Sequence, residues 1–363
     1  MLLQKGSTMN KKINIKKLIA IILITLSVLF IAGVILTKIL FNINFGGGSE
    51  IRTYSGYYIY EDIKDKYPRE QITFDSGENT LTGYIYAPEN KKGLIVFAHG
   101  IGSYADNYLS LQTAFIDMGY SVFSYDSTGC GNSEGKGVVG LCQSALDLDA
   151  ALTYIEGSEM FENIPLLVMG HSWGGYAAAE ILRYDHDIAA SVSISGYSEP
   201  LEMISAEAEN IVPAPLAKLL YPAMLINQYM LFGDIYNNSA AEAVSNTDIP
   251  VLIIHGADDD FIIPDGQGII KYKNEINNPH AEFFYAPNRG HSDLWWADSA
   301  VEYNNEINRL YEEFYKSQNG EITESEDMAW YAENIDKAER SRLDDSFIAL
   351  IDDFYTRAII SRT

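Results

Sequence analysis

The sequence predicts an α/β protein in which a mostly parallel sheet is covered by helices on both faces. Short, continuously apolar runs recur along the chain, for example "GLIVFAHG" at 93–100 and "PLLVMGHS" at 165–172. Such runs are typical of strands buried on both faces, as the strands of a parallel sheet are. Segments with the apolar spacing of helices separate the runs. The alternation of the two kinds of segment therefore predicts the fold class.

The amino terminus carries an apolar stretch that is long enough to cross a membrane. Residues 18–37 contain no charge, and a helix of about twenty residues spans the roughly 30 Å of the hydrocarbon core. The basic run "KKINIKK" at 11–17 precedes the stretch, and basic flanks tend to stay cytoplasmic. We therefore expect a cytoplasmic leader (1–17), a transmembrane anchor (18–40) and a flexible linker (41–56). This would be a single-pass protein of the cell membrane with its body outside, and a cleaved signal peptide is the alternative.

The body begins with a hairpin signal and continues as alternating strands and helices. "QITFDSGENTLTGYIYAP" at 71–88 has two alternating runs around a turn, which predicts antiparallel strands at one edge of the sheet. Besides the two runs quoted above, we expect strands at 121–126, 189–196, 250–256 and 281–287. We expect helices at 110–120, 140–156, 174–185, 266–276 and 299–315.

One stretch interrupts this alternation, and it predicts a helical cap over the sheet. Residues 197–247 have no strand signal and contain the apolar, proline-interrupted run "PLAKLLYPAMLINQYMLFG". We expect the cap to roof a pocket with apolar side chains that favour an acyl chain, with the cap's own core as the alternative. The expected roof residues are Leu219, Leu220, Tyr221, Met224, Leu225 and Met230.

The domain that contains this cap is expected over residues 57–316, followed by an acidic helical extension over 317–363. In the extension, several apolar residues share one helical face, which predicts a helix that docks on the body. These residues are Leu343, Phe347, Leu350, Ile351 and Phe354.

Charge and cysteine content exclude several classes of function. The formal net charge is −25, and because the first 38 residues hold six lysines and no acid, the remainder carries −31. A body this acidic repels nucleic acid, so we expect no nucleic-acid partner. Cys130 and Cys142 are too few for a disulfide framework, and no Cys/His cluster has zinc spacing. We expect two free thiols, no metal and no cofactor.

The stretch "GHSWG" at 170–174 places Ser172 between a predicted strand and a predicted helix. A tight turn alone would explain the glycines. The strand–turn–helix context is, however, what a nucleophile elbow requires, because the elbow pushes the serine hydroxyl into a cleft. Trp173 then has its backbone N–H at the start of a helix, where unpaired donors point at an anion.

A nucleophilic serine needs a base, and position in the predicted sheet selects one histidine of six. Reacting groups gather at the carboxyl ends of parallel strands. His291 lies in "NRGHSDLWW", the loop after the last predicted strand, and we take it as the base. The other five lie at the wrong end of the sheet, point away from Ser172, or end a strand in a structural His-Gly pair: His186, His280, His171, His99 and His255.

The histidine in turn needs an acid that holds its tautomer. The loop "GADDDF" at 256–261 follows the preceding strand and contains three aspartates. We take Asp259 as the acid, with Asp260 as the alternative. A solvated turn or a cation site would also explain three acids in a loop, but neither explains why they precede His291 by one strand–helix–strand unit.

Residues 70–315 resemble the α/β-hydrolase superfamily, in the order Ser, Asp, His that this family uses. Four motifs carry the resemblance: "HGIG" at 99–102, "DSTGCGNSEG" at 126–135, "GHSWGG" at 170–175, and the acid loop followed by "GHSD" at 290–293. The resemblance implies that the backbone N–H groups of Ile101 and Trp173 form the oxyanion hole. The second motif resembles serine-aminopeptidase and lysophospholipase-like branches, in which an arginine often replaces Thr128. This departure leaves the substrate open.

The resemblance implies a serine hydrolase that cleaves a carboxylic ester through an acyl-enzyme, and the apolar amino-terminal stretch, which lies outside the resemblance, predicts that this enzyme is membrane-anchored. Its partners would be the membrane, through the amino-terminal helix, and a small-molecule or lipid-like acyl substrate. If the protein is an enzyme of another kind, the alternative is a serine peptidase, an aminopeptidase or an acyltransferase on the same fold. If it is not an enzyme, the alternative is a non-catalytic surface module.

Overall fold

The computed structural model describes residues 15–362, and an eight-stranded sheet lies at its centre. The strands are β1 (Arg69–Ser76), β2 (Asn79–Tyr86), β3 (Leu94–Ala98), β4 (Ser121–Asp126), β5 (Leu166–His171), β6 (Ile188–Ile194), β7 (Val251–Gly256) and β8 (Ala281–Ala286). Their order is β1-β2-β4-β3-β5-β6-β7-β8. The hairpin β1–β2 is antiparallel and joins β4 antiparallel, and the remaining pairs are parallel. The predicted fold class is confirmed, with the antiparallel strands at the expected edge.

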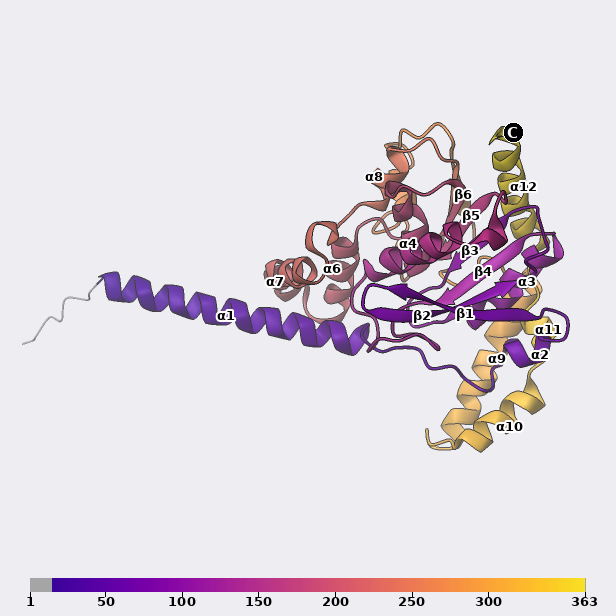
Figure 1. Ribbon diagram of the computed structural model, residues 1–363. Helices are drawn as coiled ribbons and strands as arrows, with labels where there is room; N and C mark the ends of the chain where they lie inside the picture. The colour runs from indigo at the N-terminus through magenta and orange to yellow at the C-terminus, as the bar shows by residue number, and fades with distance from the viewer. Residues whose placement is uncertain (1–14, 363) are drawn as a thin grey trace, which may run out of the picture.

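Helices cover both faces of the sheet (Figure 1), and each face has its own apolar core. Strand β3 illustrates the division, because Val96 packs into one core while Ile95 and Phe97 pack into the other. One core holds α4 (Gln143–Glu156), α5 (Trp173–Glu180) and α8 (Ala240–Ser245). The other holds α3 (Leu109–Asp117), the start of α9 (Asp298–Ser317) and α12 (Asp345–Arg362). The carboxyl ends of the parallel strands therefore lie between two packed helical layers.

The chain between β6 and β7 is helical, which confirms the predicted cap. It contains α6 (Pro200–Ile211), α7 (Ala214–Phe232), the 3₁₀ turn η4 (Gly233–Ile235) and α8. Helices α6 and α7 pack on each other, and α7 also packs on the long helix α1 (Ile15–Asn44).

The helix expected at 266–276 is wrong, because this segment forms only the 3₁₀ turn η5 (Ile269–Tyr272). Its backbone groups make short turn bonds within the segment and also bond to the loop after β6. The N–H of Ile269 donates to Gly196 O at 3.0 Å, and Gln267 O accepts from Ser198 N–H at 2.8 Å. A Cβ at Gly268 would lie 2.8 Å from the His255 ring. The close approach to neighbouring loops overrides the helical spacing of the apolar residues.

Helix α1 begins the described chain and projects away from the rest of it (Figure 1). Among residues 15–362 it is the one helix long and apolar enough to cross a membrane. It runs to Asn44, beyond the anchor expected to end at residue 40. Residues 1–14 of the expected basic leader lie outside the described residues.

The segment after α1, expected as a flexible linker, is fixed to the body by hydrogen bonds. Ser49 O accepts from Gly131 N–H at 2.7 Å, and Arg52 N–H donates to the Tyr104 hydroxyl at 3.2 Å. A short helix, α2 (Tyr60–Ile63), follows before the hairpin. The glycine-rich composition therefore serves close packing here: a Cβ at Gly48 would lie 2.0 Å from Gly129 O.

The carboxyl-terminal segment returns to the body through three helices. They are α10 (Glu324–Asn334), α11 (Lys337–Arg340) and α12. Phe347, Ile351 and Phe354 of α12 are buried against α3 and β6, and the Tyr355 hydroxyl donates to Val168 O at 2.7 Å. The remaining short turns are η1 (Ala105–Tyr108), η2 (Glu159–Phe161) and η3 (Ile181–Arg183). Cys130 and Cys142 are buried free thiols, as expected.

Candidate active site

Ser172 occupies a sharp turn between β5 and α5. Its backbone has φ 59° and ψ −114°, a conformation that L-residues rarely adopt and that is typical of strained functional turns. The flanking glycines make the turn possible. A Cβ at Gly170 would lie 2.0 Å from Gly174 O, and a Cβ at Gly174 would lie 2.0 Å from Ala98 O. The local sequence thus provides the space that a nucleophile elbow needs.

The structure brings Ser172, His291 and Asp259 into one hydrogen-bonded row. His291 Nε2 lies 2.8 Å from Ser172 Oγ, and His291 Nδ1 lies 2.8 Å from Asp259 Oδ2. The three residues come from the loops after β5, β8 and β7, at the carboxyl edge of the sheet. Asp260 is exposed, whereas the Asp259 side chain is completely buried. Of the two candidate acids, Asp259 is therefore the one that contacts His291.

Asp259 is held as a carboxylate by several donors. Its Oδ1 accepts backbone N–H groups from Phe261 at 3.0 Å and Ile262 at 2.9 Å. Burial by itself would raise the pKa of Asp259, but hydrogen bonds from His255 and His291 and the charge of His291 hold the pKa below its usual range. His255 Nε2 lies 3.2 Å from Asp259 Oδ2 and 2.8 Å from Ile262 O. His255 therefore supports the acid from beneath the loop.

Of the two expected oxyanion donors, Trp173 directly follows Ser172, and Ile101 directly follows Gly100, where a Cβ would lie 3.4 Å from Ser172 Cβ. Trp173 is the first residue of α5, so its N–H has no partner within the helix. Within residues 15–362 no acceptor bonds the N–H of either Ile101 or Trp173. The loop that carries Ile101 is held by His99, whose Nδ1 lies 2.8 Å from Gly100 O while its Nε2 accepts Ser127 N–H at 2.9 Å.

A buried relay that sequence reasoning missed connects this loop to the His291 loop. Gly100 N–H donates to the Tyr108 hydroxyl at 3.0 Å, and that hydroxyl lies 2.8 Å from His171 Nδ1. His171 Nε2 lies 2.8 Å from His291 O. Burial, and then the neighbouring His291, lower the pKa of His171 to about 3, so its ring is neutral at pH 7. A neutral ring with the proton on Nε2 satisfies every bond in the relay. No motif marked Tyr108, and His171 could be placed only as pointing away from Ser172.

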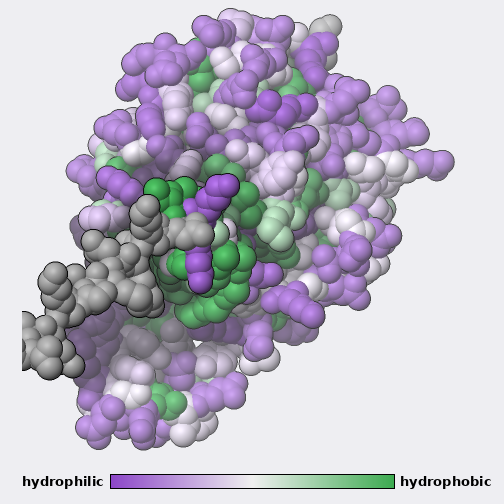
Figure 2. Space-filling model, turned by 90° about the vertical axis from the view of Figure 1, so that its left-hand side faces the viewer, coloured by the Kyte–Doolittle hydropathy of each residue, from purple (hydrophilic) through white to green (hydrophobic). Residues whose placement is uncertain are grey.

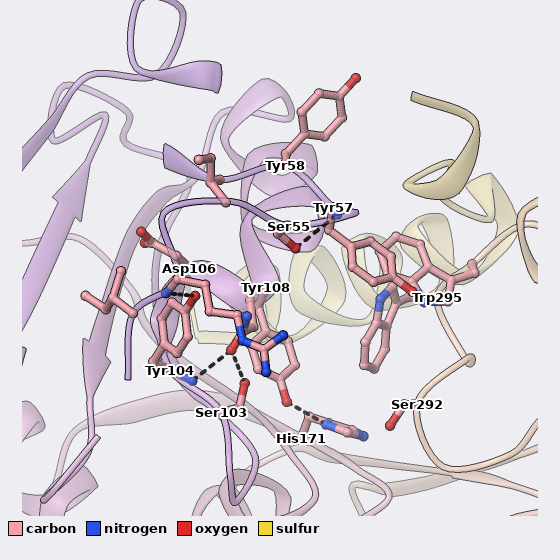
Figure 3. A pocket seen from close by; sticks show the side chains of 15 residues that line it. Ser55, Tyr57, Tyr58, Ser103, Tyr104, Asp106, Tyr108, His171, Ser292 and Trp295 are labelled. Carbon is pink, nitrogen blue, oxygen red and sulfur yellow. Dashed lines mark hydrogen bonds between the residues drawn. The ribbon is translucent and has the colours of Figure 1, made fainter. Parts of the chain in front are cut away.

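A cavity of about 220 Å³ adjoins this relay (Figure 3). Tyr108 and His171 form one part of its lining, and Tyr57 and Trp295 face them from another side. The segment after α1 contributes Tyr57 together with Ile51, Arg52, Ser55, Tyr58 and Ile59. Ser172, His291 and Asp259 do not line this cavity; it approaches them only through His171 and Ser292, which neighbour Ser172 and His291 in the chain. The linker therefore forms part of the wall of this cavity.

The expected roof of apolar cap residues does not form as a unit. Leu219 and Met230 are 75% and 74% exposed on α7, whereas Met224 is buried in the core below it. Leu220 lies against α1, where it is 3.6 Å from the position of a Cβ on Gly33. Helix α7 packs on both α6 and α1, and this leaves the Leu219 and Met230 side of the helix turned outward. The acyl-chain preference expected from the roof loses that support.

The loop "DSTGCGNSEG" shapes the neighbourhood of the site through two buried carboxylates. Asp126 accepts Ala105 N–H and Asn132 N–H, both at 2.9 Å, and so ties η1 to the loop. Asp147 accepts the N–H of Thr128 at 2.8 Å and its hydroxyl at 2.9 Å. Thr128, the position where related branches often have arginine, therefore bonds inward to a structural acid.

The two histidines placed at the wrong end of the sheet stay away from the row. His186 lies 2.8 Å from Asp149 and 2.9 Å from Glu156, and His280 is exposed. Within residues 15–362 no group of three or more His, Cys, Asp or Glu side chains has a geometry that holds a metal ion.

Comparisons with known proteins agree with this fold. The family described as serine aminopeptidase, S33, matches residues 89–241. The chain is 21% identical over 215 residues to the "Alpha/beta hydrolase domain-containing protein WAV2" of Arabidopsis thaliana. The match covers 57% of this chain and 66% of the relative, which is just under two thirds of the relative's length. In structure it is similar to the esterase Pf2001 of Pyrococcus furiosus. The TM-score is 0.53 at 18% identity, over 76% of this chain and 99% of the esterase. A second crystal form of that esterase gives a TM-score of 0.52 over 75% and 98%.

The chain has the fold of the α/β-hydrolases, and these matches support its membership of the α/β-hydrolase superfamily. The same matches indicate an enzyme of the serine-hydrolase type.

Proposed function

We propose that the chain is a membrane-anchored hydrolase of carboxylic esters, with Ser172 as nucleophile, His291 as general base and Asp259 as the acid that orients it. The observation that carries the proposal is the position of His291, which lies 2.8 Å from both Ser172 Oγ and Asp259 Oδ2. A base bonded on one side to a hydroxyl and on the other to a buried carboxylate is suited to proton transfer. Helix α1 would hold the enzyme on the outer side of the cell membrane.

In the first half-reaction, Ser172 Oγ attacks the ester carbonyl carbon as His291 Nε2 takes the hydroxyl proton. The carbonyl oxygen becomes an oxyanion, which the N–H groups of Ile101 and Trp173 stabilise by about 3–4 kcal/mol per donor in comparable sites. The bond to the alcohol then breaks, and His291 gives its proton to the leaving oxygen. The acyl group remains on Ser172 as an ester.

In the second half-reaction, a water molecule gives a proton to His291 and attacks the acyl carbon. The tetrahedral intermediate collapses, the bond to Ser172 Oγ breaks, and His291 returns the proton to that oxygen. The acyl group leaves as a carboxylic acid. This sequence needs no cofactor, and the acyl substrate can be a small molecule or lipid-like.

A peptidase is the second candidate, because the family that matches residues 89–241 is described as serine aminopeptidase. Acidic cap residues would be needed to bind a peptide amino terminus. Glu202, one such residue, already pairs with Lys271 at 3.1 Å. That ion pair occupies one of the acids that could bind a peptide amino terminus.

The test is a comparison of the full chain, in detergent or nanodiscs, on p-nitrophenyl butyrate and on a panel of aminoacyl p-nitroanilides. Ester turnover that disappears in Ser172→Ala, with no turnover of the anilides, is the expected result. Turnover of anilides with a free amino terminus, at a kcat/KM above that of the ester, would replace the ester proposal with the peptidase.

A further inference from the structure

Helix α7 presents an apolar surface on an otherwise acidic protein. It is nineteen residues long and contains one lysine, Lys218, and no acid, in a chain with a formal net charge of −25. Its exposed apolar residues are Leu216, Leu219, Tyr221, Tyr229, Met230 and Leu231. Leu219 and Met230 are eleven residues apart and therefore lie on the same side of the helix. Leu216 lies one turn before Leu219, so Leu216, Leu219 and Met230 form one exposed apolar face, and such a face marks an interaction site.

The same helix is fixed against α1 by polar and close apolar contacts. Asn227 Nδ2 donates to Val34 O at 2.9 Å and to Thr37 Oγ1 at 2.7 Å. A Cβ on Gly33 would lie 3.6 Å from Leu220 and 3.7 Å from Ala223, so the small residue allows the helices to approach. The position of α7 along the α1 axis is thereby determined.

That position places α7 at the end of the apolar stretch of α1. The contact residues, Gly33 to Thr37, directly precede Lys38. Four residues of helix rise about 6 Å, so α7 meets α1 within about 6 Å of the polar end of the stretch. Amphipathic helices that lie in a membrane interface bury their apolar face to a depth of about 5–10 Å. Figure 2, which looks along α1 toward the body, shows hydrophobic residues gathered around α1 and a mostly hydrophilic surface around them.

Basic side chains accompany this apolar surface. Lys38 and Lys136 line a cavity of about 410 Å³ between α1, α7 and residues 136–139, and no acid lines it. The buried Gln228 side chain also lines it, and its Oε1 has no hydrogen-bond partner within residues 15–362. Lysines beside an apolar helix are the arrangement that binds phosphate headgroups above acyl chains.

We propose that the exposed face of α7, defined by Leu216, Leu219 and Met230, lies in the outer interface of a phospholipid bilayer. The occupant of this surface is lipid, because α7 packs on α1 at the end of its apolar stretch and is itself largely apolar, with one lysine and no acid. The inference rests on the membrane anchoring in the proposed function. Its consequence is that the cap is held in the membrane surface, with the sheet and its active site above it.

The test uses single-cysteine labelling of the full chain in phosphatidylcholine vesicles that contain doxyl-labelled lipid. An environment-sensitive fluorophore is attached to Met230→Cys on α7. Met328→Cys on α10 is the matched control, because Met328 is also an exposed methionine. Ile24→Cys in the middle of α1 reports insertion of the anchor. Cys130 and Cys142 are buried, and the labelled parent chain gives the background.

The expected result is a blue-shifted emission and loss of fluorescence at positions 24 and 230, with neither change at position 328. Quenching at 24 but not at 230 would overturn the docking of α7 while leaving the anchor intact. No quenching at 24 would overturn both. Hydrolysis of p-nitrophenyl butyrate is measured in the same vesicles, so a quenched but inactive enzyme would contradict the proposed reaction and leave the docking supported.

Discussion

Removing the hydroxyl of Tyr108 should misplace both the base and the oxyanion loop of this enzyme. In Tyr108→Phe, Gly100 N–H loses its acceptor and His171 Nδ1 loses its donor, and both groups are buried. Each unpaired buried group costs about 1–3 kcal/mol. We expect this cost to be divided between stability and catalytic geometry. If about 1.4–3 kcal/mol raises the barrier, kcat falls by about 10-fold to 100-fold.

The assay is turnover of p-nitrophenyl butyrate by the full chain, with kcat and KM measured separately. KM should change little, because the hydroxyl holds protein groups and not substrate. Tyr104→Phe is the matched control: Tyr104 lines the same cavity, but its hydroxyl bonds the linker at Arg52 N–H. The reasoning is refuted if the kcat values of Tyr108→Phe and Tyr104→Phe agree within about twofold, because the loss of two buried hydrogen bonds should cost more than about 1 kcal/mol.

The acid, the buried histidine and the elbow glycine give three more expectations. Asp259→Asn should lower kcat by orders of magnitude and Asp260→Asn by at most a few-fold, because only Asp259 contacts His291; equal losses in the two variants would argue against this assignment. The pKa of His171 is lowered from 6.5 to about 3, so the stability it contributes is complete above pH 6.5 and is lost as the pH falls toward 3. Denaturant titrations from pH 7 to 4 should show that the free energy of unfolding falls with pH, and His171→Gln should reduce the slope of this fall by up to about 1.4 kcal/mol per pH unit. An unchanged slope in His171→Gln would count against a buried neutral ring. Gly174→Ala should not fold, because its Cβ would lie 2.0 Å from Ala98 O, whereas Gly47→Ala meets nothing within 4 Å and should melt like the parent.

The sheet and the row of reacting groups could be predicted because they depend on patterns that lie within short stretches of sequence. Buried parallel strands are continuous apolar runs, and the carboxyl end of each strand locates the loop that follows it. Chain order therefore brought Ser172, His291 and the acidic loop to one edge of the sheet. The sequence left Asp259 and Asp260 as alternatives because it does not show which of two adjacent side chains in a loop points toward His291. Burial of one and exposure of the other follow from the loop conformation.

Other features depend on contacts between distant segments, which no local pattern records. The segment at 266–276 has helical spacing, yet bonds from Ile269 N–H to Gly196 O and from Ser198 N–H to Gln267 O hold it in turns around a 3₁₀ helix. The glycines at 46–48 suggested a flexible linker, but they allow close backbone packing against residues 129–137. The direction of Leu219 and Met230 was decided by α1, which occupies the adjoining side of α7.

The central claim is that Ser172 is a nucleophile activated by His291, and covalent labelling tests it most directly. The full chain is treated with a fluorophosphonate, and the modified peptide is identified by mass spectrometry. The account predicts a single adduct on Ser172, no adduct in a folded Ser172→Ala variant, and labelling slowed by orders of magnitude in His291→Ala. An adduct at another residue, or labelling that persists in folded Ser172→Ala, would contradict it.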